Sequence, residues 1–165
     1  MIQKKVCLLG GTAVGKTSLV SRFVHSIFSD TYLTTIGVKI EKKSIETPDG
    51  QVDLILWDLY GEDEYQKMRQ SYLRGAAGYL LVVDGTRRET LDAALDLRDS
   101  AERTIGRVPF VLVANKADLT ARWEVDDRML LDLSLRGWPI VKTSAKTGAG
   151  VEEAFGTLTR AVLQG

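Results

Sequence analysis

Short apolar runs alternate with amphipathic stretches along the chain. Residues 6–9 form a continuous apolar run, which is typical of a strand buried on both faces. After a turn that contains glycines, apolar residues recur at the spacing of one helical face. These residues are Leu19, Val20, Phe23, Val24 and Ile27. The pattern therefore predicts a strand, a turn and an amphipathic helix at the start of the chain.

A hairpin is predicted next. Residues 38–46 begin with alternating apolar and polar side chains, and residues 52–57 are mostly apolar. Between them lies the turn sequence Pro48-Asp49-Gly50. The neighbouring segments lack a clear period and are predicted as loops at 26–37 and 59–66, followed by a helix at 65–74.

Three further steps from strand to helix fill the second half. The predicted strands are residues 79–83, 110–114 and 140–141, and the predicted helices are residues 88–105, 125–135 and 151–163. Thr86 and Glu89 have the spacing of a capping box for the first of these helices. The last helix carries an apolar stripe that is predicted to be core: Val151, Ala154, Phe155, Leu158 and Val162.

Strands that alternate with helices indicate an α/β fold. The six predicted strands favour a mostly parallel six-stranded sheet with one antiparallel edge strand, helices on both faces and right-handed crossovers. In such sheets, ligands bind at the carboxyl ends of the strands. The polar motifs described below follow strand ends, so we expect them to form one site.

Length and composition agree with a single domain over residues 1–165. The 22 basic and 22 acidic residues balance, so neither nucleic acid nor an acidic membrane surface is an expected partner. Cys7 is the single cysteine and is predicted to be a buried thiol within the first apolar run. One cysteine forms no internal disulfide, which fits a reducing, cytoplasmic setting.

Nothing in the sequence predicts attachment to a membrane. No apolar run approaches the about 20 residues needed to cross a bilayer. The first residues, Met-Ile-Gln, are not a myristoylation signal, and the last, Ala-Val-Leu-Gln-Gly, contain no cysteine for prenylation. We expect a monomer with no lipid anchor within this chain. The alternative is an anchoring tail outside these residues.

Residues 10–17 read Gly-Gly-Thr-Ala-Val-Gly-Lys-Thr and match the phosphate-binding pattern G-x-x-x-x-G-K-[ST]. Gly10 and Gly15 permit a backbone whose N–H groups face phosphate oxygens at the start of a helix. Lys16 supplies charge for the β and γ phosphates, and the Thr17 hydroxyl suits Mg²⁺. The predicted phosphate-binding residues are Gly11, Thr12, Ala13, Val14, Gly15, Lys16, Thr17 and Ser18. The alternative is a glycine-rich turn with an exposed lysine.

A second motif points to the base. Asn115-Lys116-Ala117-Asp118 follows a predicted strand and matches N-K-x-D. The Asp118 carboxylate can accept from N1–H and the exocyclic amine of guanine, a pair of donors that adenine lacks. Asn115 is predicted to brace the loop, and the stem of Lys116 is predicted to lie over the ring.

A third motif, Ser144-Ala145-Lys146, follows the last predicted strand. The backbone N–H of Ala145 can donate to guanine O6. Either base motif alone is compatible with a polar surface turn. Both motifs, in this order after a phosphate loop, indicate GTP or GDP as the ligand.

With these motifs, the chain resembles the Ras superfamily of small GTPases over essentially its whole length, and within it the Rab branch. The Rab-like stretches are residues 35–38, Trp57-Asp58 followed by Gly61, residues 71–76 and residues 78–84. The resemblance implies the P-loop NTPase fold of small G proteins. It also implies a molecular switch that hydrolyses GTP with Mg²⁺ as cofactor.

The resemblance assigns roles to further residues. It implies that Thr35 binds Mg²⁺ when the γ phosphate is present, that Asp58 holds a metal-bound water and that the Gly61 N–H contacts the γ phosphate. Phe28 would pack edge-on to the base. Considered alone, Phe28 is equally compatible with the core, and Asp58 with a cap of the following turn.

The resemblance also implies partners. In Rab-like proteins an aromatic triad forms part of the surface that partners recognise, and the corresponding residues here are Ile40, Trp57 and Tyr72. Effector proteins, exchange factors and GTPase-activating proteins are the partners implied. Ile40 departs from the usual phenylalanine, which leaves any specific Rab effector open.

The chain departs from the family at the segment that orients the attacking water. The family pattern is D-T-A-G-Q, and this chain has Asp58-Leu59-Tyr60-Gly61-Glu62. An ionised carboxylate accepts hydrogen bonds but donates none, unlike glutamine, so Glu62 predicts slow hydrolysis. Alternatives are that Glu62 acts as a general base or points to solvent. The predicted catalytic residues are Lys16, Thr35, Gly61 and Glu62.

Two other functions stay open at this point. Tyr60 and Glu62 are compatible with a binding module that holds GTP or GDP and never cycles. A phosphate loop also occurs in ATP-dependent kinases, but the two base motifs argue against adenine.

Overall fold

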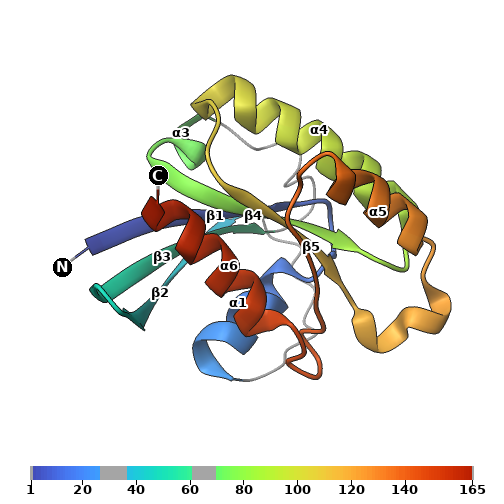
Figure 1. Ribbon diagram of the computed structural model, residues 1–165, viewed down its shortest axis with the longest axis horizontal. Coiled ribbons are helices and arrows are strands. Elements are labelled where there is room, and N and C mark those ends of the chain that lie inside the picture. Colours follow the sequence, from blue (N-terminus) through green and yellow to red (C-terminus); the bar gives the residue numbers. More distant parts are fainter. Residues whose placement is uncertain (1, 27–36, 61–69, 165) are drawn as a thin grey trace.

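The computed structural model describes residues 2–26, 37–60 and 70–164 (Figure 1). Within these ranges six strands form one sheet in the order β2-β3-β1-β4-β5-β6. The strands are β1 Ile2–Gly10, β2 Gly37–Thr47, β3 Gly50–Tyr60, β4 Ala76–Asp84, β5 Phe110–Asn115 and β6 Ile140–Lys142. The helices are α1 Lys16–His25, α3 Gln70–Leu73, α4 Arg88–Ile105, the 3₁₀ helix η1 Ala117–Arg122, α5 Asp127–Leu135 and α6 Val151–Gln164.

The sheet is parallel except at one edge. β1 pairs in parallel with β3 and β4, and β4-β5 and β5-β6 are also parallel. β2 pairs with β3 in antiparallel, with Thr47 opposite Gly50 across the predicted turn. Gly50 has a φ of 118°, which an L side chain rarely adopts. The predicted six-stranded, mostly parallel sheet with one antiparallel edge strand is confirmed.

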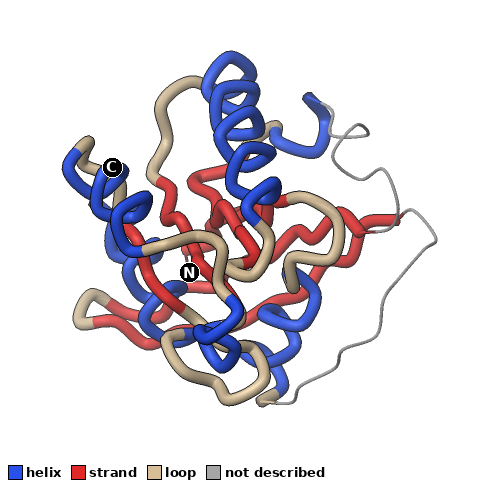
Figure 2. The backbone as a smooth tube through the Cα atoms, turned by 90° about the vertical axis from the view of Figure 1, so that its right-hand side faces the viewer, coloured by secondary structure: helices blue, strands red, loops and turns tan. Residues whose placement is uncertain are grey.

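Helices lie on both faces of the sheet (Figure 2), and alternate side chains of β1 pack into two separate clusters. On β1, Val6 and Leu8 pack into the cluster that includes α1 and α6. Cys7 and Leu9 pack into the other cluster, which includes α3, α4 and α5. Because β1 is central, both of its faces are covered, which explains its continuous apolar run.

The layer of α1 and α6 contains the predicted core stripe. The members of that stripe are all buried: Val151, Ala154, Phe155, Leu158 and Val162. Phe155 stacks on Phe23 of α1 with 3.9 Å between ring centroids. The prediction that this stripe is core is therefore confirmed. No helix in the described ranges combines the length and apolar character needed to cross a membrane.

Most predicted elements are confirmed, with boundaries that differ at their ends. The strand predicted at 6–9 extends to Ile2–Gly10, because its ladder with β3 continues beyond the apolar run. Leu59 was expected in a loop but is buried in β3 and pairs with β2, so that prediction is wrong. Of the helix predicted at 65–74, the described part is helical at Gln70–Leu73.

Helix α4 begins at Arg88 as predicted, but the predicted capping box is wrong. The Thr86 hydroxyl donates to Asp84 Oδ1 at 2.7 Å, so it faces the end of β4. The Arg88 N–H donates instead to Glu124 Oε1 at 2.9 Å. The local pattern of Thr86 and Glu89 fails because a buried carboxylate nearby accepts the Thr86 hydroxyl.

Cys7 is the buried thiol that was predicted. Its Sγ donates to the Tyr72 carbonyl at 3.5 Å. Burial raises the pKa of Cys7 to about 12. The side chain is therefore a neutral thiol within the core at physiological pH.

Candidate functional site

Three polar segments meet at the carboxyl ends of β1, β5 and β6. We call residues 10–17 the phosphate loop, residues 115–118 the first base loop and residues 144–146 the second base loop. Hydrogen bonds join all three loops, as their positions at the carboxyl ends of parallel strands in one sheet led us to expect.

The two glycines that define the phosphate-loop motif are required by their surroundings. A Cβ at Gly10 would lie 2.7 Å from the Val82 carbonyl oxygen. A Cβ at Gly15 would lie 2.3 Å from Asn115 Nδ2, and Gly15 has a φ of 102°. Lys16 then begins α1 and is only 6% exposed. The loop is therefore packed tightly against the ends of β4 and β5.

The Asn115 side chain connects the three loops. Its Nδ2 donates to the Val14 carbonyl at 3.0 Å. Its Oδ1 accepts from the Thr143 hydroxyl at 3.0 Å and from the Ala145 N–H at 3.3 Å. Asn115 is 2% exposed, so these hydrogen bonds are protected from water. This is the bracing contact predicted for Asn115.

The two base loops also contact one another. The Ser144 hydroxyl donates to Asp118 Oδ1 at 2.7 Å, and Asp118 is exposed. This bond orients the carboxylate that is predicted to recognise guanine. The Ala145 N–H, predicted to donate to guanine O6, is directed at Asn115 in this structure. Lys146 is exposed beside it.

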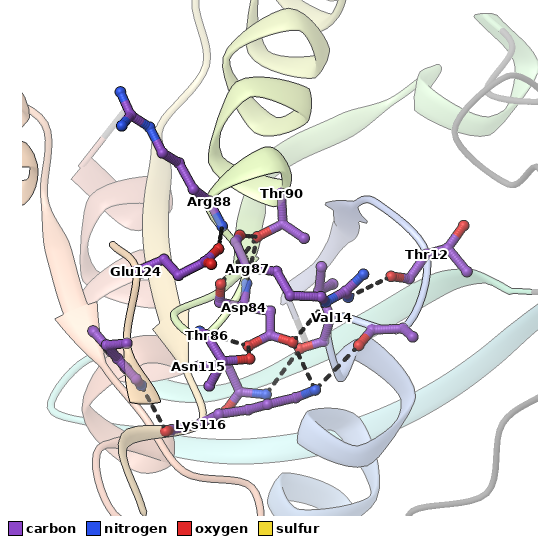
Figure 3. A network of polar contacts seen from close by, with 12 residues as sticks. Thr12, Val14, Asp84, Thr86, Arg87, Arg88, Thr90, Asn115, Lys116 and Glu124 are labelled. Carbon is purple, nitrogen blue, oxygen red and sulfur yellow. Dashed lines mark hydrogen bonds and ion pairs between the residues drawn. The ribbon is translucent and has the colours of Figure 1, made fainter. Parts of the chain in front are cut away.

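Lys116 has a left-handed backbone, with φ 74° and ψ 39°. Its Nζ lies 2.8 Å from Asp84 Oδ2 and 3.4 Å from the Ala13 carbonyl oxygen (Figure 3). The Trp123 indole N–H donates to the Lys116 carbonyl at 2.9 Å. The left-handed backbone of Lys116 is thus held by the contacts of its Nζ and by the hydrogen bond to its carbonyl oxygen.

Asp84, at the end of β4, was not among the predicted site residues. It is 1% exposed, and Lys116 and the Arg87 Nε both contact its Oδ2. Burial alone raises the pKa of Asp84, but hydrogen bonds from Lys116, Thr86 and Arg87 together lower it below its ordinary value. The signal that could have identified Asp84 is its place at the end of β4, the strand next to the one that leads into the phosphate loop.

Arg22 is a second residue that sequence reasoning missed. From α1 its Nε donates to the Ala145 carbonyl at 2.8 Å, and its Nη2 donates to the Lys146 carbonyl. These contacts tie the helix that follows the phosphate loop to the second base loop. No local signal marks Arg22, because the partners are backbone atoms more than a hundred residues away.

Two of the residues predicted to lie at the metal, Thr17 and Asp58, are in the described part of the chain and contact one another. The Thr17 hydroxyl donates to Asp58 Oδ2 at 2.5 Å. Asp58 is 1% exposed, and its other oxygen, Oδ1, is buried without a hydrogen-bond partner among the described residues. A buried carboxylate oxygen of this kind, beside a hydroxyl, fits a hard cation such as Mg²⁺ or its bound water.

Several predicted site residues lie outside the described residues: Phe28, Thr35, Gly61 and Glu62. Their implied roles stay predictions. The side chain of Tyr60 is likewise outside the described part of the chain.

The residues of the predicted recognition surface differ in exposure. Ile40 is 52% exposed on the edge strand, and Trp57 beside it is half-buried. Tyr72 is 6% exposed, and its hydroxyl donates to the Leu8 carbonyl and accepts from the Leu59 N–H, both at 3.1 Å. Burial raises the pKa of Tyr72 well above its ordinary value. In this conformation the Tyr72 side chain is therefore largely buried against β1 and β3.

Comparison with known proteins establishes the family. Residues 5–164 match the Ras family. The chain is 32% identical over 164 residues to Ras-related protein Rab-8B of Homo sapiens, which spans 96% of this chain and 78% of that protein. It is 31% identical over 161 residues to Ras-related protein Rab-13 of Canis lupus familiaris, and this match covers 96% of this chain and 79% of that protein. The chain therefore belongs to the Ras family and is a Rab-like small GTP-binding protein.

Proposed function

We propose that this chain is a GTP/GDP molecular switch that hydrolyses GTP slowly and uses Mg²⁺ as cofactor. The observation that carries the proposal is the buried Asn115 amide, which bonds to the phosphate loop at Val14 and to the second base loop at Ala145. This arrangement supports one ligand with both phosphates and a purine base. The Asp118 carboxylate favours guanine as that base.

The residues of the chain divide the phosphate chemistry among them. Lys16 supplies positive charge to the phosphates, Thr17 and Thr35 would hold the metal, and Asp58 would hold a metal-bound water. When bound, Mg²⁺ supplies further charge to the transferring phosphoryl group. We propose that Thr35 and Gly61 contact the γ phosphate and lose that contact after hydrolysis, so that partners meet two different surfaces.

Slow hydrolysis follows from Glu62. A carboxylate at the water-orienting position lacks the N–H donor of glutamine and adds negative charge beside the phosphates. Acceleration would therefore need a group from a partner. We also propose a cytoplasmic, monomeric protein that meets effectors, exchange factors and GTPase-activating proteins through a surface that includes Ile40, Trp57 and Tyr72.

Nucleotide binding is tested by thermal unfolding with Mg²⁺. GDP and GTP are expected to raise the melting temperature, because a ligand that binds only the folded state stabilises it. ADP and ATP at the same concentration are expected to leave it unchanged. A rise with ATP equal to that with GTP would favour an adenine-nucleotide enzyme such as a P-loop kinase.

Hydrolysis is tested by single-turnover assays of the native chain, Glu62→Gln and the neighbouring control Glu64→Gln. We expect Glu62→Gln to be faster by about tenfold or more, in the range of one lost transition-state contact, and Glu64→Gln to match the native rate. If Glu62→Gln hydrolyses GTP no faster than the native chain, Glu62 is not the cause of slow hydrolysis. Absence of turnover and of nucleotide exchange in every variant favours the non-cycling binding module.

A further inference from the structure

Three successive backbone carbonyls of the phosphate loop are held by side chains from other parts of the fold (Figure 3). The pairs are Arg87 Nη2 with Thr12 O at 2.7 Å, Lys116 Nζ with Ala13 O at 3.4 Å and Asn115 Nδ2 with Val14 O at 3.0 Å. Two of the donors belong to the first base loop, whereas Arg87 precedes α4. The loop is therefore held along one side by charged and polar groups.

Each of these contacts also orients an N–H group. A trans peptide is planar, with the C=O of one residue and the N–H of the next on opposite sides, and the described residues contain no cis peptide. Holding the carbonyls of residues 12–14 on one side turns the N–H groups of Ala13, Val14 and Gly15 to the other. Within the described part of the chain these N–H groups make no hydrogen bond. Such a row of inward N–H groups binds anions.

Ala13 has a backbone conformation that is unfavourable for a residue with a side chain. Its φ is 61°, in the left-handed region that costs a residue with a Cβ more than it costs glycine. The carbonyls before and after its Cα are the ones held by Arg87 and Lys116. The two contacts therefore fix both peptides that flank the strained residue.

The Arg87 guanidinium is itself held by a buried carboxylate. Its Nε lies 3.0 Å from Asp84 Oδ2, and the same oxygen lies 2.8 Å from Lys116 Nζ. Asp84 is 1% exposed at the end of β4, so its position is set by the core. The planar guanidinium binds a carboxylate and a carbonyl at once, with a fixed angle between the two bonds, which an ammonium group does not reproduce.

We propose that Arg87 is a positioning residue for the phosphate loop: it links Asp84 to the Thr12 carbonyl and so aims the Ala13 N–H at the terminal phosphates of the nucleotide. This inference rests on the guanine-nucleotide function proposed above. It adds a third side-chain contact to those of Lys116 and Asn115, and it assigns that contact to the peptide nearest the start of the loop.

The proposal is tested by nucleotide release from Arg87→Met, which keeps an unbranched stem and removes the guanidinium. A fluorescent GDP analogue is expected to leave about fivefold to tenfold faster than from the native chain, the effect of one lost charge-assisted hydrogen bond. The matched control is Arg88→Met, because Arg88 is exposed and its side chain points away from the loop in Figure 3. It is expected to release GDP at the native rate.

Two further measurements separate positioning from a general structural role. GMP lacks the terminal phosphates, so its affinity is expected to change by less than about twofold in Arg87→Met, while GDP affinity falls about fivefold to tenfold. Equal losses for GMP and GDP would overturn the proposal. Arg87→Lys keeps the charge without the fork and is expected to release GDP at an intermediate rate.

The outcomes distinguish this proposal from the proposed function. A native chain that binds no guanine nucleotide overturns the function itself. Tight GDP binding by the native chain with native release from Arg87→Met overturns only the role of Arg87. Native release from Arg87→Lys would assign the effect to charge alone and would also overturn it. If Arg87→Met does not fold, Arg87→Lys carries the test.

Discussion

At the scale of single residues, the Asp84 carboxylate joins three side chains beside the phosphate loop. It accepts from Lys116, Arg87 and Thr86, and it is almost fully buried. Its lowered pKa means that folding favours the ionised form. The stabilisation is therefore complete above the unfolded pKa of about 4 and is lost as pH falls through the lower folded pKa.

This predicts a pH-dependent effect of Asp84→Asn. At pH 7 the free energy of unfolding is expected to fall by about 1 to 3 kcal/mol, because two part-buried contacts to cations lose the charge of their buried acceptor. The difference from the native chain is expected to shrink as pH is lowered below about 4, measured by urea unfolding. The control is Asp99→Asn, whose side chain is 61% exposed. A difference that stays constant to pH 3 or grows there contradicts this account.

At the scale of elements, the start of α4 shows how a distant segment replaces a local cap. Glu124 lies between η1 and α5, and its carboxylate accepts from the Arg88 N–H. The same segment returns to β4, since the N–H groups of Glu124 and Val125 both donate to the Gly85 carbonyl. One N–H group at the start of the helix therefore has its partner through a tertiary contact.

Glu124→Ala is expected to lower the free energy of unfolding by about 0.5 to 1 kcal/mol, through loss of one partner for a helix N–H and of a negative charge at the helix N-terminus. Glu89→Ala, which removes the acid of the local pattern, is expected to change it by less than about 0.5 kcal/mol. Chemical denaturation of the three proteins gives the comparison. A larger loss of stability for Glu89→Ala than for Glu124→Ala would contradict this account and favour the capping box of Thr86 and Glu89.

At the scale of the whole molecule, the helix that carries the phosphate loop is held by the core beneath it. Phe23 of α1 stacks on Phe155 of α6, and Arg22 of the same helix reaches the second base loop. The sheet and both helical layers thus place loops that are far apart in the sequence around one site. The geometry of the three loops therefore depends on packing at a distance from them.

Phe155→Ala is expected to lower the free energy of unfolding by about 3 to 5 kcal/mol, because it opens a cavity in a closed core. The surface control Leu135→Ala, at a side chain that is 77% exposed, is expected to change it by less than about 0.5 kcal/mol. Thermal unfolding with and without GDP measures both. GDP is expected to restore part of the stability of Phe155→Ala, and a fully native melting temperature without GDP would contradict the role of this stack.

The meeting of the three loops was predictable from short motifs, because each motif needs particular residue types at fixed spacing directly after a strand, and the hydrogen bonds of Asn115 join them. Asn115 was expected to brace a loop, and it does so. Arg22 and Arg87 were missed, because their partners are backbone carbonyls that no residue type reveals.

By itself the sequence determined the α/β class, the order of the strands and helices and the motif residues, since hydrophobic period and glycine chemistry are local properties of the chain. Tertiary structure alone decided which side chain meets which backbone group: Glu124 at α4, Arg87 at Thr12 and Tyr72 beneath the surface. A hydrogen bond needs its two atoms within about 3 Å, and such closeness between distant segments is set only when the sheet and its helices pack.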